Sequence, residues 1–199
     1  MEKTRILKLT TTFMAMLAVI MSSFAMFPQA SDAANNKNKP TEVNQMLTLI
    51  NDFRTKNGLK KVKVNTTLTT TAGNWAGYLA DTNDYDKYSD FVTKAPAGWS
   101  SPGEIKGSTS PGSVKYLFEE WAKSPAHANV IKNPAANIVG IGLAYDNSGT
   151  LHGTLNFFNY AKAPAGTYTT FPGGTTTPTK PKQVFTDVNS SVIFKKEIE

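Results

Sequence analysis

The sequence predicts an α+β domain, and three observations lead to that fold class. Apolar residues recur at helical spacing in the first part of the domain, and two strand-like runs, 137–145 and 150–160, close it. The Asp-Asn-Ser-Gly segment between these runs is typical of a tight turn, so they are expected to pair as an antiparallel hairpin. Because cysteine is absent, a hydrophobic core must hold the domain without disulfides. Helices followed by a hairpin indicate a layered α+β arrangement.

The first 33 residues have the pattern of a secretory signal peptide. Basic residues precede an apolar stretch over 13–27, and the small residues Ser31 and Ala33 suit cleavage after Ala33. The apolar stretch is short for a membrane span, and an uncleaved N-terminal anchor is the alternative. We therefore expect an exported protein with no membrane span after cleavage, in which a polar leader over 34–40 precedes a domain at 41–161.

Helical patterns account for most of the domain before the hairpin. The first covers 41–57, where an apolar stripe ends at Asn-Gly. A second helix is expected to begin at the capping candidates 65–67. Ser113 is a candidate cap for a third helix, and a short helix follows Pro125 because proline suits a first helical turn.

The segment 81–111 is rich in Asp, Gly, Pro and Ser and is expected to be a long irregular loop. Loops of this length are usually functional or mobile. The acidic run 81–86, with Asp90, invites a calcium interpretation. It lacks the glycine at position six and the glutamate at position twelve of an EF-hand loop, so a solvated acidic loop is favoured.

Charge excludes one class of partner. The chain carries a net charge of +6, but residues 41–160 hold eleven Lys and Arg against ten Asp and Glu. A nucleic-acid site needs clustered positive charge on the folded domain. We therefore expect no nucleic-acid partner.

The composition changes after the domain. Residues 162–184 are rich in Thr, Pro and Gly, which is typical of an extended linker. Residues 185–199 begin Phe-Thr-Asp-Val and are similar to the opening of an S-layer homology module, which attaches surface proteins of Gram-positive bacteria to wall polysaccharide. Only the start of such a module is present, so we expect a truncated one.

The ordered motifs of the domain resemble those of a known family. They are N-D-F-R-x-x-x-G-L in the first helix, A-x-x-W-A in the second, then P-G-E, W-A-K-S-P-A-H and I-V-G-I-G. This series is similar to the bacterial branch of the CAP superfamily, the cysteine-rich secretory, antigen 5 and pathogenesis-related proteins, also called SCP-like extracellular domains. The resemblance implies an α-β-α sandwich with an antiparallel sheet between helices and a cleft over the sheet.

The resemblance also implies which residues face that cleft. Glu104 matches the glutamate of the family's Gly-Glu-Asn segment. His127 matches the histidine of its Ser-Pro-x-His segment, and His152 matches the first residue of its His-Tyr-Thr-Gln strand motif. We add Glu119 as the helical acid expected to approach the cleft. Family members bind a divalent metal, lipids or sterols there. The family's early histidine has no counterpart in 81–90.

Two kinds of site chemistry are open for these residues. Glu104, His127 and His152 are a candidate weak site for zinc or calcium, because two imidazoles and a carboxylate form a recurrent ligand set. No cofactor is expected to be required. The alternatives are that His127 caps or packs a helix junction, and that His152 lies on a solvated strand face.

The enzyme hypothesis is a hydrolase or protease with His127, Glu104 and Ser124 as candidate catalytic residues. Ser124 precedes His127 by three residues, and Glu104 or Glu120 can orient the imidazole. No G-x-S-x-G nucleophile elbow occurs. The sequence favours a secreted, extracellular or wall-associated monomer without enzymatic activity. Its cleft is expected to bind a small apolar ligand, a wall polymer or a protein partner.

Overall fold

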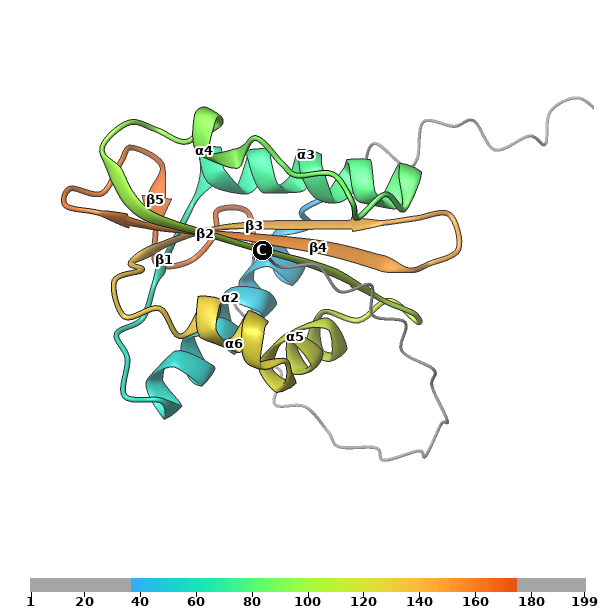
Figure 1. The fold of residues 1–199 in the computed structure, drawn as a ribbon, viewed down its shortest axis with the longest axis horizontal. Coiled ribbons are helices and arrows are strands. Elements are labelled where there is room, and N and C mark those ends of the chain that lie inside the picture. The colour runs from blue at the N-terminus through green and yellow to red at the C-terminus, as the bar shows by residue number, and fades with distance from the viewer. Residues whose placement is uncertain (1–36, 175–199) are drawn as a thin grey trace, which may run out of the picture. The chain divides into compact units, whose positions relative to one another are not determined.

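A computed structural model describes residues 37–174, which form one sheet between two layers of helices (Figure 1). Helices α3 (Thr66–Thr82) and α4 (Phe91–Lys94) cover one face of the sheet. Helices α2 (Pro40–Lys56), α5 (Val114–Lys123) and α6 (Pro125–Ile131) cover the other. The predicted α-β-α sandwich is confirmed.

The sheet has the strand order β2-β4-β3-β1-β5. The strands are β1 (Lys63–Asn65), β2 (Trp99–Thr109), β3 (Ile138–Tyr145), β4 (Leu151–Tyr160) and β5 (Thr167–Tyr168). Strands β3 and β4 pair as the predicted antiparallel hairpin. The sheet is otherwise antiparallel except that β1 runs parallel to β3.

Strand β2 corrects the expectation of an irregular loop over 81–111. It pairs with β4 from Trp99 to Thr109, with a register shift between Ser100 and Gly103 where Pro102 interrupts the ladder. Its sequence contains several Ser and Gly residues and no run of β-branched residues. Strand formation here depends on the partner strand rather than on local propensity, so the pattern does not reveal it.

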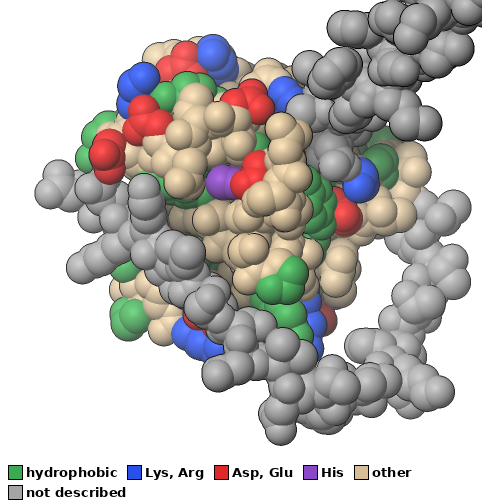
Figure 2. Space-filling model, turned by 90° about the vertical axis from the view of Figure 1, so that its right-hand side faces the viewer, with side chains coloured by type: hydrophobic (Ala, Val, Ile, Leu, Met, Phe, Trp, Pro, Cys, Tyr) green, Lys and Arg blue, Asp and Glu red, His purple; other side chains and the backbone are tan. Residues whose placement is uncertain are grey.

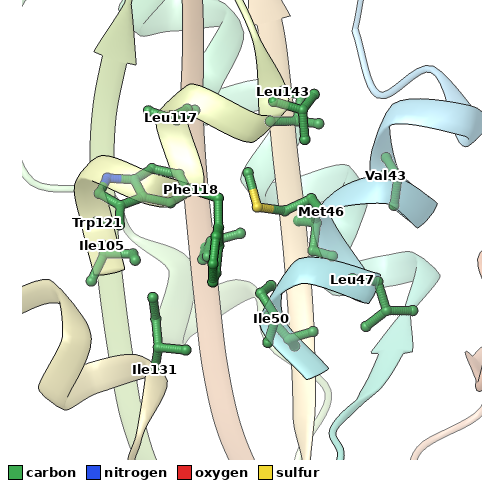
Figure 3. Packing of buried hydrophobic residues seen from close by; sticks show 14 of the residues in the cluster. Val43, Met46, Leu47, Ile50, Ile105, Leu117, Phe118, Trp121, Ile131 and Leu143 are labelled. Atoms are coloured by element: carbon green, nitrogen blue, oxygen red, sulfur yellow. The ribbon is translucent and has the colours of Figure 1, made fainter. Parts of the chain in front are cut away.

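The larger part of the core lies between the sheet and helices α2 and α5 (Figure 3). Met46 and Ile50 of α2 meet Leu117 and Trp121 of α5 over the sheet, and all four are fully buried. The indole of Trp121 fits because glycines lie beneath it in both neighbouring strands. A Cβ on Gly153 would come 2.8 Å from its ring.

The other face of the sheet carries the polar side chains. Alternation places Leu151, Leu155 and Phe157 of β4 on the α2/α5 side, so the residues between them face α3. Helix α3 packs closely on β3, where Gly140 and Gly142 lie against its backbone. The polar positions of β2 and β4 therefore lie beside α3, beneath the segment that follows it.

Packed structure continues beyond the expected boundary at residue 161. Strand β5 pairs with β1, and Phe171 packs against the main core. The side chain of Asn44 donates to the carbonyl oxygen of Phe171 at 3.0 Å and accepts from its amide at 2.7 Å. The first part of the expected linker over 162–184 is thus attached to the domain. The predicted signal peptide and the S-layer-like segment lie outside the described residues.

Candidate functional site

Six polar side chains of the two neighbouring strands β2 and β4 form what we call the polar floor. Three pairs lie directly opposite one another across the ladder, and so share one face of the sheet: Glu104 with Asn156, Lys106 with Thr154, and Ser108 with His152. Four of the six are buried: Lys106, His152, Thr154 and Asn156. Buried polar groups need hydrogen-bond partners, so the partners of the floor define what the site can do.

Glu104 is bound on two sides by neutral donors. Its Oε2 accepts hydrogen bonds from the hydroxyl of Ser89 and, at 2.8 Å, from Nδ2 of Asn156. Burial raises the pKa of Glu104, while these two hydrogen bonds and the charge of Lys106 oppose the shift. The carboxylate thus joins β4 to the segment after α3.

The side chain of Lys106 holds the segment after α3 through backbone carbonyl groups of that segment. Its ammonium donates to the carbonyl oxygens of Tyr85 and Lys87, each at 2.7 Å, and lies 5.3 Å from the ring centre of Tyr88. Within the described residues it forms no ion pair with a carboxylate. The positive charge of Lys106 is therefore stabilised by two carbonyl dipoles and by the face of an aromatic ring.

His152 is 2% exposed and lies beneath Tyr85. The Tyr85 hydroxyl is 2.9 Å from Nδ1 of His152, and Oδ2 of Asp146 is 3.4 Å from Nε2. Burial raises the pKa of Tyr85 to about 12 and lowers the pKa of His152, which Asp146 opposes. Tyr85 therefore keeps its proton and donates to Nδ1 of a neutral imidazole, whose Nε2–H faces Asp146.

A pocket of about 500 Å³ opens beside the polar floor, between α3, α4 and β4. Its walls include four aromatic rings, those of Trp75, Tyr78, Tyr88 and Phe91. From the polar floor, Asn156 lines the pocket directly, and Glu104 lies behind it as its hydrogen-bond partner. The volume is within the usual range for small-molecule sites.

The remaining predicted site residues lie elsewhere. His127, on α6, is 6% exposed and lies on the opposite side of the sheet from the pocket. Burial lowers its pKa, while a hydrogen bond with the backbone of Lys106 opposes the shift. Glu119 pairs with Lys115 on the outer side of α5 at 3.5 Å. Ser124 lies at the α5–α6 junction, and no capping hydrogen bond from its side chain occurs in the described part of the chain.

The candidate metal residues do not meet. Among residues 37–174, no three His, Asp or Glu side chains lie together as a metal-binding group. Glu104 and His152 share the polar floor but have separate partners, and the sheet separates both from His127. The residues present therefore do not fit a zinc or calcium ion held by this set.

The candidate catalytic set is divided for the same reason. No hydrogen bond joins Ser124, His127 and Glu104 in the part of the chain that the structure describes. A Ser-His-acid mechanism requires each member within hydrogen-bonding reach of the next. The motifs place the three residues in the sequence but do not show that Glu104 of β2 faces one side of the sheet while α6, with His127, lies on the other.

Sequence reasoning missed the residues that hold the site together. Lys106 and Ser89 gave no signal, because their partners come from segments that the irregular-loop prediction left unplaced. Asn156 could be found from the sequence, because alternation along the strand places it on the same polar face as His152.

Figure 2 shows the molecule from the right-hand side of Figure 1. Acidic and basic side chains are interspersed there, and apolar side chains do not form one continuous patch. The described residues visible on this face therefore form no single-sign surface for a strongly charged partner. Among the described residues, no helix is long and apolar enough to cross a membrane.

Comparison with known proteins shows which family and which solved structures the chain is similar to. The model of the cysteine-rich secretory protein family, CAP, matches residues 47–159, which is more than half of the chain. An outer surface protein from Borrelia burgdorferi is similar in structure, with a TM-score of 0.53 and 17% identity over 62% of this chain and 97% of the other. An extracellular protein from Bacillus anthracis with an SCP domain has a TM-score of 0.52 and 18% identity, over 67% of this chain and 45% of the other.

At these identities the two structures establish the fold alone. A search of curated proteins gave no match. The family match, the order of elements and the shared fold agree with one another. The chain belongs to the cysteine-rich secretory protein family, CAP.

Proposed function

We propose that the chain is an exported, cell-surface or wall-associated CAP protein that binds a small ligand without converting it. The observation that carries this proposal is the pocket of about 500 Å³ between α3, α4 and β4, with aromatic walls and Asn156 at its base. Pockets that combine apolar walls with a few placed polar groups are the usual form of small-molecule sites.

Export is supported by the signal-peptide pattern of the first 33 residues. The two similar structures are those of an outer surface protein and of an extracellular protein. A function outside the cytoplasm is consistent with a domain that has no cysteine to lose to oxidation.

The arrangement of the polar groups favours binding over hydrolysis. Glu104 is held by Ser89 and Asn156, whereas His127 lies across the sheet. In a hydrolase, the general acid, the nucleophile and the base that activates it must all lie within reach of the same reacting atoms of the substrate. Peptidase or esterase activity that disappears in both His127→Ala and Glu104→Ala, with folding intact, would overturn the non-enzymatic assignment.

The pocket can be tested by filling it. Thr71 lines it from α3, whereas Thr70, one position earlier, is exposed and does not. We expect fatty acids or soluble wall fragments to raise the melting temperature of the full chain and of Thr70→Trp. Thr71→Trp should lose that shift, because the indole occupies the pocket. Equal shifts in both variants would place binding elsewhere.

A further inference from the structure

The polar groups around the pocket select a class of ligand, and this step rests on the proposed function. Asn156 Oδ1 and Trp75 Nε1 are buried and, within residues 37–174, have no hydrogen-bond partner. Both residues line the same pocket. Asn156 is itself 1% exposed, and its Nδ2 is already bound to Glu104, so its free atom is an acceptor. A buried polar atom left unpaired costs about 1–3 kcal/mol.

A hydroxyl group supplies what both atoms lack. It donates one hydrogen bond and accepts others, so it suits the Oδ1 acceptor and the Nε1–H donor alike. The protein already places one hydroxyl here, since Ser89 lines the pocket and donates to Glu104. An acyl chain would leave Oδ1 and Nε1 unpaired.

The charges at the pocket favour a neutral ligand. Asp90 and Lys94 both line it, and they pair with each other at 2.9 Å. Lys87, whose ammonium lies 5.5 Å from the ring centre of Tyr78, pairs with Asp84 at 3.5 Å. The charges of Asp90, Lys94, Asp84 and Lys87 are therefore neutralised in pairs, and the charge of the buried Lys106 is directed at backbone carbonyl oxygens.

The walls suit a molecule with flat apolar faces as well as hydroxyl groups. Trp75 and Tyr78 stack with ring centres 4.9 Å apart, and Tyr88 is 67% exposed at the rim. Aromatic rings bury C–H groups favourably, while their polar edges keep hydrogen-bonding contacts. We propose that the pocket binds a neutral, hydroxyl-rich ligand, an oligosaccharide segment, through Asn156 Oδ1 and Trp75 Nε1.

Calorimetric titration of the full chain with three neutral tetrasaccharides, cellotetraose, maltotetraose and chitotetraose, tests this proposal. At least one should give saturable heat. Asn156→Leu should weaken that binding about tenfold or more, and Trp75→Phe, which keeps an aromatic ring but removes the N–H, about threefold to tenfold. Thr70→Val is the control. It removes an exposed hydroxyl of α3 that does not line the pocket, so affinity should be unchanged.

The outcomes separate this inference from the proposed function. No saturable heat with any of the three sugars overturns the sugar assignment. If palmitate then binds and Thr71→Trp abolishes that binding, the ligand pocket stands and its ligand is apolar. Sugar binding that survives both Trp75→Phe and Asn156→Leu also overturns the proposal. Trp75→Phe keeps the test decisive if Asn156→Leu fails to fold.

Discussion

Arg54 shows how a single residue can join distant parts of this domain. It is fully buried, and its guanidinium donates four hydrogen bonds to the backbone carbonyl oxygens of Lys60, Ile131, Asn133 and Ala136. Burial lowers its pKa, yet among the described residues it has no ion pair with a carboxylate. The carbonyl dipoles near the end of α6 compensate for its charge. The N-D-F-R motif located this arginine, but sequence alone gave no reason to bury it.

The two histidines make stability depend on pH. Burial lowers the pKa of both His127 and His152 below the ordinary value of 6.5. The unfolded chain therefore binds more protons than the folded chain as the pH falls through 6.5, and the free energy of unfolding should decrease there. Urea titrations between pH 7.5 and 5.5 measure this. The free energy of unfolding should change less with pH in His152→Gln than in the parent chain, and less again when His127→Gln is added.

Glu104 acts in the opposite direction. Its raised folded-state pKa means that folding favours its protonated form, so its ionisation above 4.5 reduces stability. Its contribution is thus separable from that of the histidines by its sign, because it lowers the free energy of unfolding as the pH rises. An unchanged slope in the double histidine variant would show that other groups cause the loss near pH 6.5.

At the scale of elements, the contact between α5 and the sheet depends on glycine. A Cβ on Gly153 would come 2.5 Å from Leu117 Cδ2 and 2.8 Å from the Trp121 ring. We expect Gly153→Ala to lower the free energy of unfolding by about 1–3 kcal/mol, because both side chains must move. Gly103→Ala is the comparison, since its Cβ would meet only one methyl group of Val130, at 3.0 Å. Equal losses in chemical denaturation would contradict this packing argument.

The elements also show what sequence could and could not predict. Helices α2 and α5 and the β3–β4 hairpin were predicted, since their apolar residues recur with the period of the structure. Strand β2 was not, because its pairing with β4 outweighs a sequence rich in Ser and Gly. The site was located only in part for the same reason. Glu104 and His152 share a polar face, but Ser89, Tyr85 and Lys106 could not be placed while β2 was read as loop.

At the scale of the whole domain, the packed chain includes residues after the last long strand. Phe171 is half-buried against the main core, and its backbone is bonded to Asn44 on α2. Phe171→Ala should lower the free energy of unfolding by roughly 1–2 kcal/mol through lost apolar burial. Thr169→Ala, an exposed position nearby, should have little effect. Similar denaturation midpoints for Phe171→Ala and the parent chain would show that this segment is not needed for stability.

The clamp formed by Lys106 bears on how the pocket can change over evolutionary time. The ammonium holds the carbonyl oxygens of Tyr85 and Lys87, which every amino acid possesses, rather than their side chains. These two contacts do not depend on the side chains at 85 and 87, although the buried Tyr85 adds a side-chain hydrogen bond to His152. Substitutions of the exposed Tyr88, which lines the pocket, can therefore alter what the rim presents to a ligand while the Lys106 contacts still hold the chain, so selectivity can drift without loss of the fold.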